Sequence, residues 1–129
     1  MTYHISKKIA KQDFSSAKEK VTEALKSEGF GVLTEIDIQA TMKKKLDKDY
    51  KPFVILGACN PVFADKVLSI DPNMSAMLPC NVSLRELESG EIEVSAIDPI
   101  AAMASVGHGD IEPLAKEVRN KLERVVEKV

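Results

Sequence analysis

The amino-acid sequence predicts a single α+β domain over residues 1–129, with a mainly antiparallel sheet of about five strands and helices packed on one face. Its 129 residues match the usual size of one domain, and 44% of them are hydrophobic, enough to form a core without a disulfide or a metal. A tight turn at Ser89 and Gly90 joins two alternating segments, the clearest antiparallel hairpin in the chain. No glycine-rich phosphate loop follows a predicted strand, which disfavours a nucleotide-binding enzyme of the common types.

The chain opens with a strand and a helix. Residues 3–9 alternate between two faces and predict the first strand. Asp13 then offers an N-cap oxygen, and apolar residues recur at helical spacing as far as Leu25. Gly29 can adopt the left-handed conformation that ends a helix. We therefore predict a helix over residues 13–28.

The next segments predict two strands separated by a short helix. Residues 30–38 alternate again, so their apolar side chains should share one face. Residues 39–51 predict a short surface helix whose lysines, at 43–45, form a solvated face. Pro52 opens a third strand, residues 53–58, that is apolar on both faces. Because such a strand is normally covered on both sides, we predict a homodimer whose second subunit supplies the missing cover.

A helix and a hairpin follow. Asn60 and Pro61 place an N-cap directly before a proline at the first helical position, a strong helix start, and this helix should end at Asp71. After a methionine-containing connection, residues 80–87 predict a fourth strand and residues 92–96 a fifth.

Two helical segments complete the chain. Residues 100–106 predict one or two helical turns, followed by a Gly-His-Gly loop. The last helix begins near residues 110–113 and runs to the end, with its apolar residues in one stripe. A late hairpin with helices around it favours the α+β class over a doubly wound parallel sheet.

Charge and composition exclude several classes of protein. Lys plus Arg (18) nearly balance Asp plus Glu (20), for a net charge of −2, unlike the strongly basic balance of a nucleic-acid binder. The first residues contain no apolar stretch of a secretory signal. No apolar run approaches the ~20 residues needed to cross a bilayer. We therefore expect a cytoplasmic protein, with reduced thiols and without nucleic-acid or membrane partners.

The most unusual feature is a Cys-Asn dipeptide that occurs twice, at residues 59–60 and 80–81. Cys59 ends a buried strand directly before a helix start, where free backbone N–H groups and the helix dipole favour a thiolate. Cys80 alternates in phase with the apolar residues of its strand and should point into the core. If the third and fourth strands are neighbours, the two thiols approach each other.

Three interpretations of these cysteines remain open. In the simplest, both are small buried hydrophobic residues. In the second, Cys59, Asn60, Cys80 and Asn81 surround a site that binds a small ligand or a soft metal. In the third, the protein is a thiol-based redox or sulfur-transfer enzyme with Cys59 as nucleophile and Cys80 as resolving thiol.

Ligands for a metal are few. The two cysteines lie 21 positions apart and form no CxxC knuckle, and only His4 and His108 offer imidazole nitrogens. His108 lies in the Gly-His-Gly loop, which could swing over a site, so it is included among the candidate ligand-binding residues. Met74, Met77 and Met103 could add thioether ligands for Cu(I), although methionine in an apolar context is more often a core residue. No complete metal site is predicted.

Other catalytic arrangements have little support. The chain contains no Gly-x-Ser-x-Gly elbow and no His-Glu-x-x-His motif. Glu35 and Asp37 could share a strand face as an acid–base pair, but Asp37 is equally suited to cap the helix that follows. The sequence therefore neither predicts nor excludes an enzyme.

Several short segments together resemble a known family. They are residues 29–32, 35–37, 57–61, 78–82 and 96–99, which read Gly-Phe-Gly-Val, Glu-Ile-Asp, Gly-Ala-Cys-Asn-Pro, Leu-Pro-Cys-Asn-Val and Ala-Ile-Asp-Pro. With them the sequence resembles the family called domain of unknown function 302, small α+β proteins of bacteria and archaea. The paired Cys-Asn segments in this order are the most specific part of the likeness.

This resemblance implies a fold but no reaction. Members have a curved antiparallel sheet backed by helices, similar to the TATA-binding-protein-like arrangement, and no established activity. The resemblance therefore carries over no catalytic role. It suggests Cys59, Asn60, Cys80 and Asn81 as the motif positions.

Overall fold

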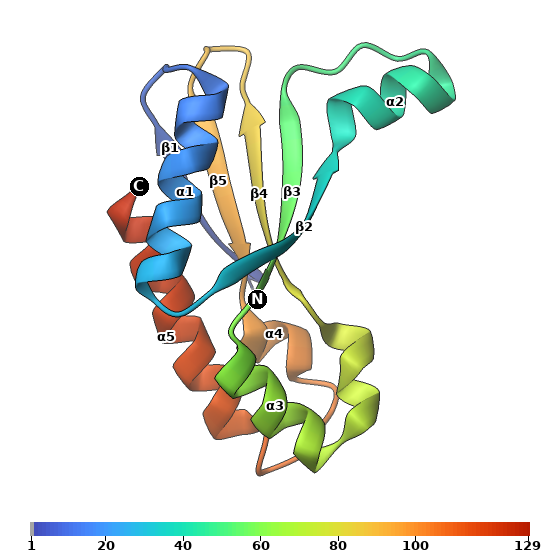
Figure 1. Ribbon diagram of the computed structural model, residues 1–129, viewed down its shortest axis with the longest axis vertical. Coiled ribbons are helices and arrows are strands. Elements are labelled where there is room, and N and C mark those ends of the chain that lie inside the picture. Colours follow the sequence, from blue (N-terminus) through green and yellow to red (C-terminus); the bar gives the residue numbers. More distant parts are fainter. Residues whose placement is uncertain (1) are drawn as a thin grey trace.

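The computed structural model describes residues 2–129, and its centre is one antiparallel sheet of five strands (Figure 1). The strands lie in the order β1-β5-β4-β3-β2, and every neighbouring pair is antiparallel. This arrangement confirms the α+β class. The strands are β1 His4–Ile9, β2 Gly31–Asp37, β3 Phe53–Cys59, β4 Cys80–Glu86 and β5 Ile92–Ile97.

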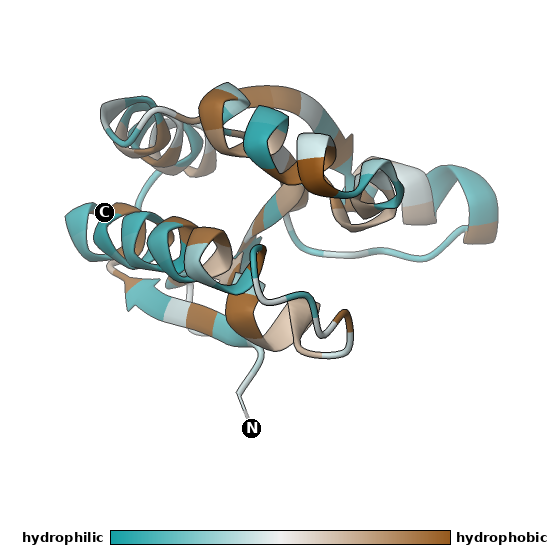
Figure 2. Ribbon diagram, turned by 90° about the horizontal axis from the view of Figure 1, so that it is seen from below, coloured by the Kyte–Doolittle hydropathy of each residue, from teal (hydrophilic) through white to brown (hydrophobic). Residues whose placement is uncertain are grey.

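Two long helices cover one face of the sheet, and three short elements lie beyond one end of it (Figure 1). The long helices are α1 Phe14–Ser27 and α5 Glu112–Lys128. Beyond the end of the sheet lie α3 Pro61–Ile70, the 3₁₀ helix η1 Pro72–Met77 and α4 Pro99–Met103. Apolar and polar stretches share each long helix, as expected of helices with one buried side (Figure 2).

The hydrophobic core lies between the sheet and the two long helices. Alternate residues of β3, β4 and β5 face it, and Leu56, Leu84 and Ile92 are almost completely buried there. Leu25 of α1 and Leu122 of α5 pack against them from the helix side. A smaller cluster around Met74 joins α3, η1 and the start of α5.

Helix boundaries follow the local signals in the sequence. The Asp13 carboxylate accepts a hydrogen bond from the Ser16 N–H, and Asp37 caps α2 (Ile38–Leu46) in the same way through Ala40. Gly29 has φ +85°, the left-handed conformation predicted to end α1. Local chain chemistry therefore sets these boundaries.

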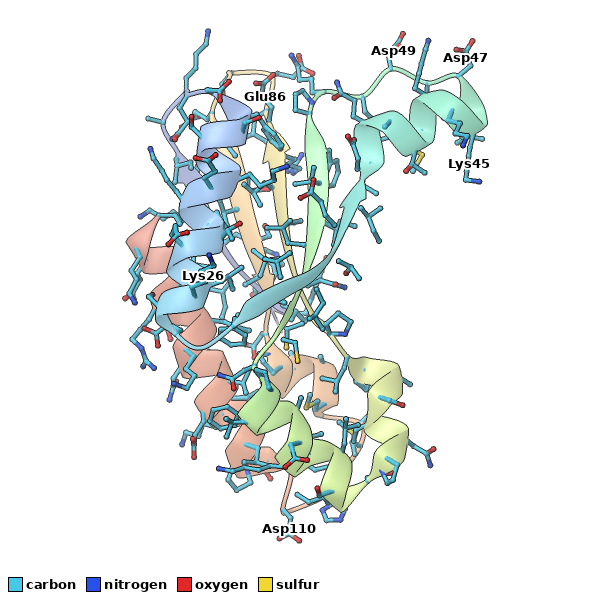
Figure 3. The ribbon with its side chains drawn as sticks, viewed as in Figure 1. Lys26, Lys45, Asp47, Asp49, Glu86 and Asp110 are labelled. Atoms are coloured by element: carbon cyan, nitrogen blue, oxygen red, sulfur yellow. The ribbon has the colours of Figure 1, made fainter. Side chains whose placement is uncertain are left out.

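Helix α2 projects away from the body of the molecule (Figure 1). Lys45, Asp47 and Asp49 lie at its tip, and Asp110 lies at the opposite end of the molecule (Figure 3). Lys43 forms ion pairs with Asp47 at 2.8 Å and with Asp49 at 3.2 Å. Residues 43–45 are all exposed, so the lysine run is a solvated helix face, as predicted.

The second strand differs from the regular alternation predicted for residues 30–38. Val32 pairs with Ala58, but Thr34 pairs with Gly57, so the register shifts by one residue at a bulge. A bulge transfers the following residues to the other face of the sheet. Ile36 is consequently 49% exposed, and the prediction of one shared apolar face was wrong.

The sheet face opposite α1 and α5 carries partly buried residues of β3. Phe53 and Ile55 point to this side, between the buried Val54 and Leu56 of the core side. The homodimer that would cover this face stays a prediction. Among residues 2–129, no helix is both long and apolar enough to pass through a membrane.

Candidate functional site

The two cysteines come from adjacent strands at the same end of the sheet. Ala58 of β3 pairs with Cys80 of β4, so Cys59 is one residue beyond the paired position. Both thiols are free and both line one cavity, which we call the inner cavity. The predicted neighbourhood of the third and fourth strands is thus confirmed, whereas the close approach of the two sulfur atoms stays a prediction.

The inner cavity is small and apolar. Its volume is about 40 Å³, space for about three water molecules and far below the size of an organic ligand pocket. Besides the Cys-Asn segments, Phe30 and residues of α3, α4 and α5 close it. Its lining includes Phe63, Val67, Pro99, Met103, Leu114, Ala115 and Val118. Apart from Asn60, the lining side chains are apolar or carry sulfur, and the sulfur atoms are those of Cys59, Cys80 and Met103.

The two thiols have different surroundings. Cys80 is 9% exposed, whereas Cys59 is half-buried. Burial, and secondarily the neighbouring Cys59, raises the pKa of Cys80 to about 11. Since a low-dielectric environment disfavours the charged form, Cys80 is a protonated thiol at neutral pH unless a cation replaces its proton.

Asn60 is buried because it joins two helices. Its Oδ1 accepts a hydrogen bond from the Phe63 N–H at 3.5 Å and caps α3, while its Nδ2 donates to the Glu28 carbonyl oxygen at 3.3 Å. Glu28 follows α1, and Gly29 packs so close that an added Cβ would lie 3.0 Å from Asn60 Nδ2. The Asn60 amide thus holds the backbone beside the cavity, and a direct ligand contact by Asn60 stays a prediction.

Asn81 lies on the other side of the sheet. It is exposed, and it lines an open groove of about 240 Å³ that we call the outer groove. Cys80 lines this groove as well as the inner cavity. Met77 and Met103 also contribute to the groove. The structure therefore brings Asn81 close to Cys80 but outside the inner cavity.

His108 is apart from the thiols. It lines a third cavity, of about 300 Å³, that shares only Met103 and Ala115 with the inner cavity. Its Nδ1 accepts a hydrogen bond from the Asp110 N–H at 3.2 Å. A neutral ring in this state carries its proton on Nε2, which then has no lone pair for a metal. The role predicted for His108 as a ligand therefore gains no support from its position.

The described residues 2–129 contain no group of three or more His, Cys, Asp or Glu side chains that could hold a metal ion. The two carboxylates weighed as an acid–base pair have separate structural tasks. Glu35 forms an ion pair with Lys18 at 2.9 Å, and Asp37 caps α2. Neither carboxylate is among the residues that line the inner cavity.

The sequence could not indicate the part of the site that comes from α4 and α5. Pro99, Met103, Leu114, Ala115 and Val118 line the inner cavity but lie far along the chain from both Cys-Asn segments. Of these, only Met103 was considered as a ligand, because of its sulfur, and Pro99 was noted only within the Ala-Ile-Asp-Pro segment of the family resemblance. Their apolar character is that of ordinary core residues, so the sequence held no signal that they close a site.

An antiparallel sheet with helices on one face defines the class of protein: a small α+β domain, here with two cysteines that line one cavity at the end of the sheet. The sequence signature of the family described as domain of unknown function DUF302 spans residues 5–129. The chain belongs to this family.

A solved structure supports the fold. The chain is similar to the crystal structure of an uncharacterized conserved protein DUF302 from Bacillus stearothermophilus, with a TM-score of 0.90 and 23% sequence identity. The similarity covers 99% of this chain and 98% of that one. No functionally curated protein matches the chain. This similarity therefore supports the fold and indicates no reaction or ligand.

Proposed function

We propose that this protein binds a soft monovalent metal ion, Cu(I), between the sulfur atoms of Cys59 and Cys80. The observation that carries the proposal is that both thiols line one small apolar cavity. Thiolate and thioether sulfur are the ligands that select Cu(I), and Met103 adds a thioether to the same cavity. In a reducing compartment such as the cytoplasm, both thiols stay available and copper stays monovalent.

The size of the cavity favours an ion over an organic ligand. Pockets for drug-sized ligands have volumes of about 300–1,000 Å³, whereas the inner cavity has about 40 Å³. An ion between two strand ends needs no more space than this. If the predicted ligand is a small molecule rather than a metal ion, it can therefore have only a few atoms.

The donor set favours Cu(I) over zinc. Structural zinc takes four ligands in a tetrahedron, usually cysteine and histidine. The part of the chain described, residues 2–129, offers no third Cys, His, Asp or Glu beside the thiols. Cu(I) accepts as few as two thiolates, and a thioether such as Met103 suits it as a further ligand.

Binding exchanges protons for the metal. The two thiols release two protons, one Cu(I) takes their place, and the bis-thiolate complex carries one negative charge without any change of oxidation state. Cys59 lies directly before α3, whose N-terminus favours negative charge. Since the pKa of Cys80 is raised to about 11, the metal must compete with a tightly held proton.

The alternative function is a thiol redox or sulfur-transfer enzyme, with Cys59 as nucleophile and Cys80 as resolving thiol. A resolving thiol attacks as the thiolate, so its rate depends on the thiolate fraction. With a pKa of about 11, about one Cys80 in ten thousand is ionised at pH 7. Cys80 would therefore resolve slowly, whereas a metal can displace its proton.

An anaerobic titration with a chromophoric Cu(I) complex, such as Cu(I) bicinchoninate, tests the proposal. We expect one equivalent of Cu(I) to move to the protein, and Cys59→Ser or Cys80→Ser to abolish this transfer. His108→Ala is the matched control and should bind as the unmodified protein does. Circular dichroism checks that each variant is folded, and Cys80→Ala replaces Cys80→Ser if the buried hydroxyl prevents folding.

The pH dependence sharpens the same test. Because binding displaces the Cys80 proton, the apparent Cu(I) affinity should rise by at least about tenfold per pH unit between pH 6 and 8. Transfer that is unaffected by either cysteine substitution would contradict the proposal.

A further inference from the structure

The inner cavity is not isolated from the surface, because it shares one wall with the outer groove. Both are lined by Leu78, Pro79, Cys80, Pro99 and Met103. The groove is about six times larger, at about 240 Å³ against about 40 Å³, and it is open to solvent. Cys80 is therefore the thiol that lines both the outer groove and the inner cavity.

Two methionines line the outer groove together with Cys80. Met77, the last residue of η1, is 37% exposed. Met103, the last residue of α4, is partly buried and lines the groove and the inner cavity alike. The outer groove thus holds an exposed thioether at Met77 and a partly buried one at Met103, and Met103 also lines the inner cavity with the two thiols.

Core packing does not account for Met77. Met74, three residues earlier in the same 3₁₀ helix, is 2% exposed and packs with Val67 and Ile111. Met74 is an ordinary core methionine, whereas Met77 leaves more than a third of its surface in solvent. Met77 therefore places a thioether in the outer groove where solvent can reach it.

We infer that the outer groove is the route by which Cu(I) reaches the thiols, with the Met77 and Met103 thioethers as transient ligands. This inference rests on the proposed function of the thiol pair. A thioether is neutral, so it binds Cu(I) without losing a proton and releases it to a thiolate, which is the stronger ligand. Each step exchanges one sulfur ligand for another, Cu(I) keeps its oxidation state, and the protons leave only from the thiols.

The cavity beside His108 is the competing route. It also touches Met103, but neither cysteine lines it. Ala102 lines the outer groove, and Ala104 lines the cavity beside His108. These two alanines, both at the end of α4, allow either passage to be narrowed by a leucine without changing a sulfur atom.

Stopped-flow measurement of Cu(I) transfer from its bicinchoninate complex tests the route. Met77→Leu and Met103→Leu keep volume and remove the thioether. Each should slow loading by about tenfold, the lower end of the effect usual for residues that support metal ligands. Met74→Leu is the matched control and should load as the unmodified protein does. Ala102→Leu should slow loading, and Ala104→Leu should not.

A second measurement needs no metal. Alkylation of Cys80 by iodoacetamide, located by mass spectrometry, reports access to the thiol through the same groove. Met103→Ala should speed this reaction and Met103→Leu should not, because only the alanine opens the shared wall.

The outcomes separate the two proposals. If the unmodified protein takes up no Cu(I), the proposed function fails and the copper route fails with it. If it takes up one equivalent but Met77→Leu and Met103→Leu load at the normal rate, the route alone is overturned. Loading slowed by Ala104→Leu rather than Ala102→Leu would assign the passage to the cavity beside His108 and equally overturn this inference.

Discussion

The two Cys-Asn dipeptides have the same residues and opposite arrangements. In the first Cys-Asn segment, residues 57–61, the asparagine is 9% exposed and the cysteine is half-buried. In the second Cys-Asn segment, residues 78–82, the cysteine is 9% exposed and the asparagine is exposed. The same pair of side chains therefore acquires different roles from the backbone that carries it.

The cause is the position of each dipeptide relative to its strand. Cys80 and Asn81 begin β4, and successive residues of a strand point to opposite faces. Cys59 ends β3 and Asn60 is the N-cap of α3, so the strand alternation stops between them. The Asn60 side chain can then turn inward and donate a hydrogen bond to the Glu28 carbonyl oxygen. The Asn81 side chain points to the outer face of the sheet because strand β4 continues through it.

The largest effect should come from the point where the two segments touch. A Cβ added at Gly57 would collide with Thr34 Oγ1 and lie 2.9 Å from Pro79 Cγ. We expect Gly57→Ala to lower the free energy of unfolding by about 3 kcal/mol, the cost of overpacking a closely packed site. Chemical denaturation measures this loss.

Gly31→Ala is the control for Gly57→Ala. Gly31 also lies in a strand of the sheet, but a Cβ there would have no heavy atom within 4 Å. Its substitution should change stability by less than about 0.5 kcal/mol. Equal losses at the two glycines would show that the segments do not press on each other at Gly57.

The second prediction contrasts the two asparagines directly. Asn60→Ala removes the α3 cap and the bond to the Glu28 carbonyl, and should cost about 2 kcal/mol of unfolding free energy. Asn81→Ala should cost less than about 0.5 kcal/mol, because its side chain is exposed. Asn60→Asp keeps the cap oxygen but not the donor, so it should recover only part of the loss. Similar losses for both alanine variants would refute the division of roles.

How far the sequence predicts this molecule depends on the range of the interactions involved. The helix caps at Asp13 and Asn60 and the helix end at Gly29 act within a few residues, and the boundaries they predict are confirmed. The bond from Asn60 to the Glu28 carbonyl spans 32 residues and could not be predicted in this way. The register shift before Thr34 depends on pairing with β3, so alternation along residues 30–38 could not reveal it. The fold class followed from the local signals, whereas the bulge needed the partner strand.

The site divides in the same way. The phase of Cys80 within its strand predicted a buried thiol, and burial at 9% exposure confirms it. The size of the inner cavity depends on α4 and α5, whose residues meet the cysteines only through the tertiary fold. The contribution of Met103 to both the cavity and the groove was equally beyond the reach of sequence spacing.

The smallest effect concerns the two thiols and appears at high pH. The Cys80 pKa rises from 9.0 to about 11 on folding, mainly because of burial and secondarily because of Cys59. Between these two values the unfolded chain loses a proton that the folded chain keeps, so the thiol destabilises the fold as the pH rises. Relative to Cys80→Ala, the unmodified protein should therefore lose up to about 1.4 kcal/mol per pH unit between pH 9 and pH 11. Urea denaturation at several pH values measures the difference.

Cys59→Ala separates burial from the influence of the neighbouring thiol. Since burial is the larger cause of the Cys80 pKa shift, this variant should retain most of the loss of stability above pH 9. If the loss instead disappeared in Cys59→Ala, the neighbouring thiol, and not burial, would be the larger cause of the raised Cys80 pKa. The pKa of Cys80 in the second Cys-Asn segment would then depend mainly on Cys59 in the first, and the two thiols would have to be treated as one titrating pair.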